Sequence, residues 1–165
     1  MIIKNISKSF LIQFLLVFLI FLLDRFSKIY IVYLDGKLPG NEIYSSKFLN
    51  LNLMWNEGIA FGLLSLANKS YYNILTLVIL IITLLIFFMF VKSSGFKKYA
   101  CLMILGGALG NVFDRIFYNA VPDFIDFHIG NFHWFIFNVA DIFISLGIIF
   151  LIILEFTANN RENTI

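Results

Sequence analysis

Four stretches of the chain are long enough and apolar enough to cross a lipid bilayer, and they constrain the fold more than any other feature. They are residues 10–34, 71–91, 98–117 and 134–156. A transmembrane helix needs roughly 20 mostly apolar residues. Hydrophobic residues make up 61% of the chain and charged residues only 13%, and a soluble domain of this length cannot bury so much apolar surface. We therefore predict an all-α membrane protein, with four transmembrane helices in a single domain of residues 1–165.

The first predicted span follows two lysines, as the apolar core of a signal peptide does. However, no small-residue cleavage site follows it, and the apolar pattern continues beyond the charges at residues 24–28. We therefore expect this segment to remain in the protein as a membrane span.

The loops between the predicted spans contain two signals for non-helical structure. In the longest loop, residues 47–55 alternate partly between polar and apolar side chains, as a half-exposed strand does. We therefore predict a small extracytoplasmic β element between spans 1 and 2. In the loop of residues 118–133, Pro122 disfavours helix at Val121, so we expect a bend at Asp123.

The distribution of basic residues predicts the orientation in the membrane. Cytoplasmic loops of membrane proteins are enriched in lysine and arginine. Both termini and the short turn between spans 2 and 3 fall on one side of the membrane, and that turn is the densest basic cluster. The basic residues on this side are Lys4, Lys8, Lys92, Lys97, Lys98 and Arg161. We therefore expect both termini in the cytoplasm and the loops of residues 35–70 and 118–133 on the outer side.

Acidic residues in or beside the spans are the main indication of function. The chain has six aspartates, and four of them map to the outer half of the predicted membrane: Asp24, Asp114, Asp123 and Asp141. A charge in hydrocarbon costs several kcal/mol, so such groups face the interior of a bundle or a wet cavity. These acids, with several nearby Asn, Lys and Arg residues, predict one shared polar site.

A pair of carboxyl groups in such a site can hydrolyse a peptide bond. Two adjacent carboxyls do not both ionise easily, so one keeps its proton. The ionised group takes a proton from water, and the protonated group assists the carbonyl and the leaving amine. The residues alone leave three alternatives open: acids that only hold helices together through Arg25, Lys28 and Arg115, a proton- or ion-coupled transporter, and a non-catalytic scaffold. Clustering of the acids at one surface, without an internal repeat, is not typical of transporters.

Several classes of function are disfavoured. The net charge of +2, without a basic run, gives no reason to expect nucleic-acid binding. Cys101 is the only cysteine, so an internal disulfide or a Cys-based metal site is excluded. His128 and His133 lie near Asp126, but their spacing is not a standard zinc motif. We therefore predict no metal and no other cofactor, and we interpret these histidines as interfacial residues.

Five short motifs follow one another along the chain in the order found in one known family. Residues 24–28 (DRFSK) resemble that family's D-x-x-x-K, and residues 56–61 (NEGIAF) resemble its N-x-G-x-A-F. Residues 106–115 (GGALGNVFDR) resemble G-G-x-x-G-N-x-x-D-R. Residues 121–124 (VPDF) resemble V-x-D-F, and residues 137–141 (FNVAD) resemble F-N-x-A-D. Together the motifs extend over nearly the whole chain. In this order they resemble those of the lipoprotein signal peptidases, also called type II or prolipoprotein signal peptidases.

The resemblance implies an intramembrane aspartic endopeptidase of the bacterial inner membrane. Such enzymes remove the signal peptide from diacylglyceryl-modified prolipoproteins by cutting before the lipidated cysteine, and they need no cofactor. The resemblance makes Asp123 and Asp141 the catalytic pair, near the outer face. It makes eight further residues substrate-binding or site-supporting: Asn56, Gly58, Asn111, Asn138, Asp24, Lys28, Asp114 and Arg115. The expected partners are lipidated prolipoproteins and membrane lipid, and we expect a monomer.

Local interactions can also be predicted. Asp24 and Lys28 are four residues apart and are expected to pair on one helix face, and we expect Asp114 and Arg115 to form an ion pair that steadies the third span. The glycines of residues 106–110 predict close helix packing.

One position departs from the family pattern. Asn119 stands where family members usually have glycine, four residues before the aspartate of V-x-D-F. Asparagine tolerates a left-handed backbone better than most residues. We therefore expect the turn at this position to be kept.

Overall fold

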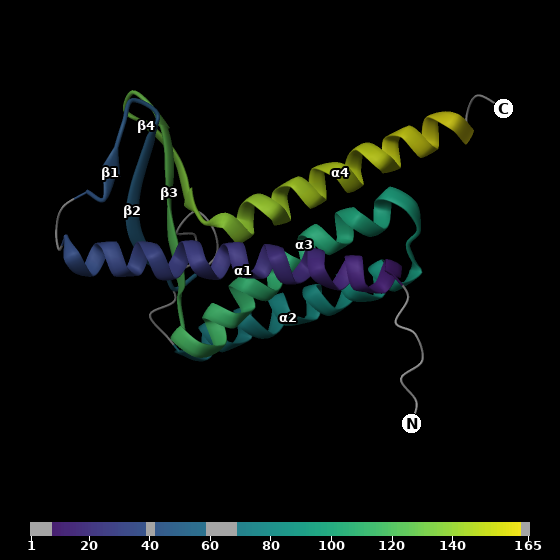
Figure 1. Ribbon diagram of the computed structural model, residues 1–165, viewed down its shortest axis with the longest axis horizontal. Coiled ribbons are helices and arrows are strands. Elements are labelled where there is room, and N and C mark those ends of the chain that lie inside the picture. Colours follow the sequence, from purple (N-terminus) through teal and green to yellow (C-terminus); the bar gives the residue numbers. More distant parts are fainter. Residues whose placement is uncertain (1–7, 39–41, 59–68, 163–165) are drawn as a thin grey trace.

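The structure is a computed structural model that describes residues 8–38, 42–58 and 69–162. Within these ranges the chain forms four long helices: α1 (Lys8–Lys37), α2 (Lys69–Lys92), α3 (Gly95–Tyr118) and α4 (Val139–Glu162). Each is long and apolar enough to cross a membrane, which agrees with the predicted spans. The helices run alongside one another, and a small sheet lies at one end of the bundle (Figure 1).

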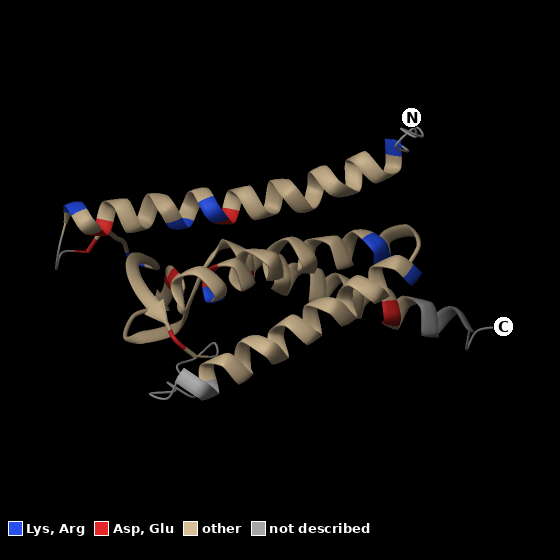
Figure 2. Ribbon diagram, turned by 90° about the horizontal axis from the view of Figure 1, so that it is seen from below, with Lys and Arg blue, Asp and Glu red and all other residues tan. Residues whose placement is uncertain are grey.

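Helix α3 is the centre of the bundle. In its most apolar stretch 72% of the residues are buried, against 17% or less in the other three helices. It packs against α4, α1 and α2. The large apolar side chains exposed on the other helices, such as Phe14, Leu85 and Ile152, are therefore suited to contact lipid. Charged residues lie mainly near helix ends, apart from a group midway along α1 (Figure 2).

A four-stranded antiparallel sheet connects the two loops at one end of the helices. Its strands are β1 (Tyr44–Ser45), β2 (Leu49–Asn56), β3 (Val121–Ile129) and β4 (Phe132–Phe137), in that spatial order. The helix ends at residues 8 and 162 lie at the opposite end of the bundle (Figure 1). The strand predicted over residues 47–55 is therefore present as β2, whereas the hairpin of β3 and β4 was not predicted.

The hairpin corrects two expectations. The fourth span was expected to begin at Trp134, but residues up to Phe137 belong to β4 and α4 begins at Val139. An apolar aromatic run looks alike in a buried helix and in a strand, so hydropathy alone placed this boundary too early. Asp123 lies inside β3 rather than at a bend, and Pro122 takes the second position of the strand.

The end of α3 confirms the expectation for Asn119. This residue has φ 55° and ψ 19°, the left-handed conformation that ends a helix. Of the non-glycine residues that the structure describes, Asn119 alone has a positive φ. Asparagine thus makes the turn from which the chain enters β3.

The glycines of α3 pack against neighbouring helices, as predicted. A Cβ on Gly106 would lie 2.8 Å from Ile20 of α1, and a Cβ on Gly110 would lie 2.5 Å from Asp24 Oδ2. A Cβ on Gly107 would collide with the carbonyl oxygen of Ala140 at the start of α4. Close contact at these three positions brings the polar residues of α1, α3 and α4 together.

Gly110→Ala is expected to destabilise the protein by about 1–3 kcal/mol, because the added methyl group would push Asp24 out of its contacts. Thermal unfolding in detergent measures the effect. Gly36→Ala is the matched control, since a Cβ on Gly36 has nothing within 4 Å and alanine favours helix. Equal stability of Gly110→Ala and the wild type would contradict the close contact between α3 at Gly110 and Asp24 of α1.

Candidate active site

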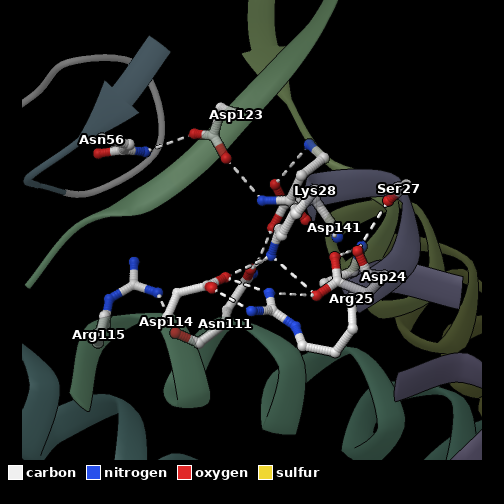
Figure 3. A network of polar contacts seen from close by, with 12 residues as sticks. Asp24, Arg25, Ser27, Lys28, Asn56, Asn111, Asp114, Arg115, Asp123 and Asp141 are labelled. Atoms are coloured by element: carbon white, nitrogen blue, oxygen red, sulfur yellow. Dashed lines mark hydrogen bonds and ion pairs between the residues drawn. The ribbon is translucent and has the colours of Figure 1, made fainter. Parts of the chain in front are cut away.

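Asp123 and Asp141 line the same cavity, at the end of the bundle where the sheet meets the helices. Asp123 lies on β3, opposite Met54 of β2, and Asp141 lies in the first turn of α4. The cavity has a volume of about 280 Å³ and is also lined by Asn56, Asn111 and Asn138. The structure therefore brings together residues from four of the five sequence motifs (Figure 3).

Two asparagine amides hold the carboxyl group of Asp123. Asn56 Nδ2 donates to Asp123 Oδ2 at 2.8 Å, and Asn138 Nδ2 donates to Asp123 Oδ1 at 2.6 Å. The backbone N–H of Gly58 donates to Asn56 Oδ1 at 2.9 Å, which turns the amide NH₂ of Asn56 toward Asp123 (Figure 3). Of the motif at residues 56–61, residues 59–61 lie outside the described residues.

Asp141 is held by the capping arrangement at the start of α4. The N–H of Asp141 donates to Asn138 Oδ1 at 3.1 Å, and the N–H of Asn138 donates to Asp141 Oδ2 at 3.1 Å. This reciprocal pair has the form of a capping box, with Asn138 as the cap. Asn111 Nδ2 donates to the other oxygen, Oδ1, at 2.8 Å. Asn138 therefore contacts both carboxyl groups, one through its side chain and one through its backbone.

The environment of Asp123 shifts its acidity toward neutral pH. Burial raises the pKa of Asp123 from 3.8 to about 6, and the nearby Asp141 carboxyl raises it too. Hydrogen bonds from Asn56 and Asn138, and the charge of Lys28, oppose the rise in pKa. A carboxyl group with a pKa near 6 can both hold and release a proton close to neutral pH.

This raised pKa predicts how stability changes with pH. Below about pH 4 Asp123 is protonated in both folded and unfolded chains; between about pH 4 and 6 the unfolded chain releases this proton more readily. Stability therefore falls over that interval, by about 3 kcal/mol if the shift is fully expressed. Asp123→Asn removes this titration, so the variant should gain stability relative to wild type from about pH 4 to 6 and then hold a constant difference. Thermal unfolding of the wild type and the variant at each pH tests this prediction. If the stabilities of the two proteins changed in parallel between pH 4 and 6, the prediction would be contradicted.

A buried ion cluster lies beside the cavity, between α1 and α3. Lys28 Nζ donates to Asp24 Oδ2 at 2.9 Å, to Asp114 Oδ2 at 2.7 Å and to Asn111 Oδ1 at 2.9 Å. Arg25 binds both oxygens of Asp114 and also Asp24. Asp24, Lys28 and Asp114 are each 1% exposed or less. The expected pair of Asp24 and Lys28 is therefore confirmed (Figure 3).

The expected ion pair between Asp114 and Arg115 is wrong. Asp114 pairs across to α1, with Arg25 and Lys28, because consecutive residues of a helix do not face each other. Arg115 instead donates to the carbonyl oxygens of Asn111, at 3.2 Å, and Gly58, at 3.5 Å. It also lines the cavity. Arg25 was not predicted as a site residue, although it lies beside Asp24 in the first motif.

The ion cluster positions both sides of the cavity. Lys28 binds the oxygen of the Asn111 amide, so the NH₂ group of that amide faces Asp141. Asp24 Oδ1 accepts the N–H of Ala140 at 3.0 Å, which fixes the start of α4 against α1. A carboxylate at a helix N-terminus is also electrostatically favourable. Four residues expected to support the site, Asp24, Lys28, Asn111 and Asp114, therefore form one connected network.

Comparison with known proteins identifies the family. The family model for signal peptidase (SPase) II matches residues 16–157. A lipoprotein signal peptidase of Pelagibacter ubique (strain HTCC1062) is 46% identical over 155 residues, covering 94% of this chain and 93% of that protein. One of Anaplasma marginale (strain Florida) is 40% identical over 149 residues, covering 90% and 86%. A solved structure described as a bacterial membrane enzyme is similar with a TM-score of 0.73 and 28% identity, covering 90% of each chain. The chain belongs to the signal peptidase II family.

Proposed function

We propose that this protein removes the signal peptide from diacylglyceryl-modified prolipoproteins, cutting before the lipidated cysteine, with Asp123 and Asp141 as its catalytic pair. The observation that carries the proposal is that the two carboxyl groups line one cavity and are both held by Asn138. Family membership supports the same reaction.

In the proposed mechanism, the pair carries one proton. The ionised carboxylate takes a proton from a water molecule, whose oxygen attacks the scissile carbonyl carbon. The protonated carboxyl hydrogen-bonds to the carbonyl oxygen and then gives its proton to the leaving nitrogen, which becomes the amino group of the lipidated cysteine. The C–N bond breaks and no covalent intermediate forms. One aspartate of Asp123 and Asp141 takes each role, and neither role is assigned to a particular aspartate, because a coupled pair titrates as a unit.

The polar neighbours keep the pair in place and bind substrate. Asn56, Asn111 and Asn138 donate to the two carboxyl groups, which restrains their orientation for proton transfer. Arg115 lines the same cavity, and its buried Nε has no hydrogen-bond partner among the residues that the structure describes. A carbonyl group of the bound peptide would satisfy this donor.

The apolar surroundings of the pair fit a lipidated peptide that enters from the bilayer. One wall of the cavity comes from α2, through residues that include Leu75, Val78 and Ile82. A second cavity, of about 480 Å³, also reaches Asp141 and is lined by apolar residues such as Phe137 and Ile142. Acyl chains and a signal helix both prefer such surfaces to water. The proposal places a monomeric enzyme in the bacterial inner membrane, with cytoplasmic termini and the catalytic pair near the outer face.

Lateral entry predicts that the lipid on the substrate matters. A diacylglyceryl-modified prolipoprotein should be cleaved faster than the same precursor without lipid, because only the first presents acyl chains together with the scissile bond. A gel-shift assay in detergent micelles or vesicles compares the two rates. Equal cleavage of a soluble, unmodified peptide would contradict lateral entry, and no cleavage of several modified precursors would contradict the proposed function.

A further inference from the structure

Three potential metal ligands that are not part of the proposed catalytic pair meet on the hairpin of β3 and β4. His128 of β3 lies directly opposite His133 of β4, and their rings stack with centroids 4.9 Å apart. Asp126 lies two residues before His128 on the same strand. One ligand atom from each of the three side chains lies within 4.8 Å of the other two. Strand pairing thus brings together residues whose spacing in the sequence gave no zinc motif.

The carboxylate of this cluster is buried and already oriented. Asp126 is 6% exposed, and its Oδ2 lies 2.8 Å from His133 Nδ1. Asn50 Nδ2 of β2 donates to the same oxygen at 3.3 Å. Asn50 is itself fixed by Ser45 Oγ, which donates to Asn50 Oδ1 at 2.8 Å. Metal sites commonly have such outer partners, which hold a ligating carboxylate in position.

The second histidine has an unsatisfied nitrogen. His128 Nδ1 is buried and has no hydrogen-bond partner among the residues that the structure describes. A buried polar atom without a partner is costly, and in folded proteins such atoms usually have one. Coordination of a metal ion through this nitrogen would satisfy it, and the ion would replace the hydrogen bond between His133 and Asp126.

We propose that Asp126, His128 and His133 bind one divalent transition-metal ion of the zinc class. Two imidazole nitrogens and one carboxylate oxygen are ligands that Zn²⁺ accepts, with water in the remaining position. Ca²⁺ and Mg²⁺ are disfavoured, because they require oxygen ligands. The ion would fasten β4 to β3 and, through Asn50, to β2. Metal binding does not require the proposed peptidase reaction, because within the described part of the chain none of the three ligands is hydrogen-bonded to Asp123 or Asp141. His128 does line the second, apolar cavity together with Asp141.

The test uses the full-length protein in detergent, without a polyhistidine tag and after treatment with EDTA. Titration with Zn²⁺ against a chromophoric chelator should give one bound ion per chain, and Zn²⁺ should raise the thermal unfolding temperature. Asp126→Asn, His128→Ala and His133→Ala should each abolish saturable binding. Asn50→Ala should weaken binding by about 10–100-fold. Glu155→Gln, which changes an exposed carboxylate on α4, should bind as wild type does.

The outcomes separate a built site from adventitious binding. His133 is half exposed, so His133→Ala should fold even if replacing the buried residues prevents folding, and this variant then decides. Failure of the folded wild type to bind Zn²⁺ would overturn the proposal. Binding that is unchanged in His133→Ala or Asp126→Asn would also overturn it, because the ion would then be held elsewhere on the surface.

Discussion

Asp123→Asn and Asp141→Asn are each expected to lower the rate of signal-peptide cleavage by about 10³-fold or more, while the protein stays folded. General acid–base catalysis by one positioned group contributes roughly 10²–10⁴-fold, and loss of either carboxyl removes the proton exchange on which the other depends. An asparagine side chain has nearly the same shape, so it keeps the cavity but can neither take nor give the proton. Single-turnover cleavage of a diacylglyceryl-modified prolipoprotein measures the effect.

Asp35→Asn is the matched control for these two variants. Asp35 lies near the end of α1, and it does not line the cavity. Its replacement should leave the cleavage rate unchanged. Thermal unfolding should show that all three variants are folded. If Asp123→Asn or Asp141→Asn retained the wild-type cleavage rate, that aspartate would not be catalytic, even though the chain belongs to the family.

Asp114→Ala is expected to destabilise the protein by about 3–5 kcal/mol. Asp114 accepts from both Arg25 and Lys28, and all three side chains are buried. Removing one partner of a buried ion pair leaves an uncompensated charge, which is far more costly than the pair itself is stabilising. The midpoint of thermal unfolding in detergent should therefore drop sharply.

An exposed ion pair provides the comparison. Lys97 Nζ lies 2.5 Å from Glu155 Oε2, and the two side chains are 42% and 62% exposed. Breaking this pair with Glu155→Gln should change stability by less than about 1 kcal/mol. If Asp114→Ala had an equally small effect, the cluster between α1 and α3 would not be stabilising the bundle, and its role in holding Asn111 would need another explanation.

The helices were predictable because their signal is local. An apolar run of spanning length needs no knowledge of its neighbours, and alternation of polar and apolar residues revealed β2 in the same way. The pairing of β3 with β2 and β4 depends on partners far apart in the chain. Residues 132–137 (FHWFIF) are apolar enough to extend a span, and only their pairing with β3 makes them a strand.

The candidate site was predictable in its residues but not in its contacts. The motifs named both aspartates, and the structure places them on one cavity; their catalytic role stays a prediction. Asn138 was expected at the site. Its hydrogen bonds to the carboxyl groups of both Asp123 and Asp141 could not be predicted, because they follow from its position as the cap of α4. The pairing of Arg25 with Asp114 depends on how α1 packs on α3, and sequence spacing could not reveal it. The approach of His133 to Asp126 likewise depends on strand register.

The central claim is that Asp123 and Asp141 cleave the signal peptide from a lipidated precursor. Its most direct test is to identify the products that the wild type, Asp123→Asn and Asp141→Asn release. A diacylglyceryl-modified prolipoprotein would be incubated with each purified protein and analysed by mass spectrometry. The account predicts that the wild type yields a signal peptide ending at the residue before the modified cysteine, and a lipoprotein with that cysteine at its N-terminus, whereas Asp123→Asn and Asp141→Asn yield neither. Cleavage at another bond, or the same products from either folded variant, would contradict the account.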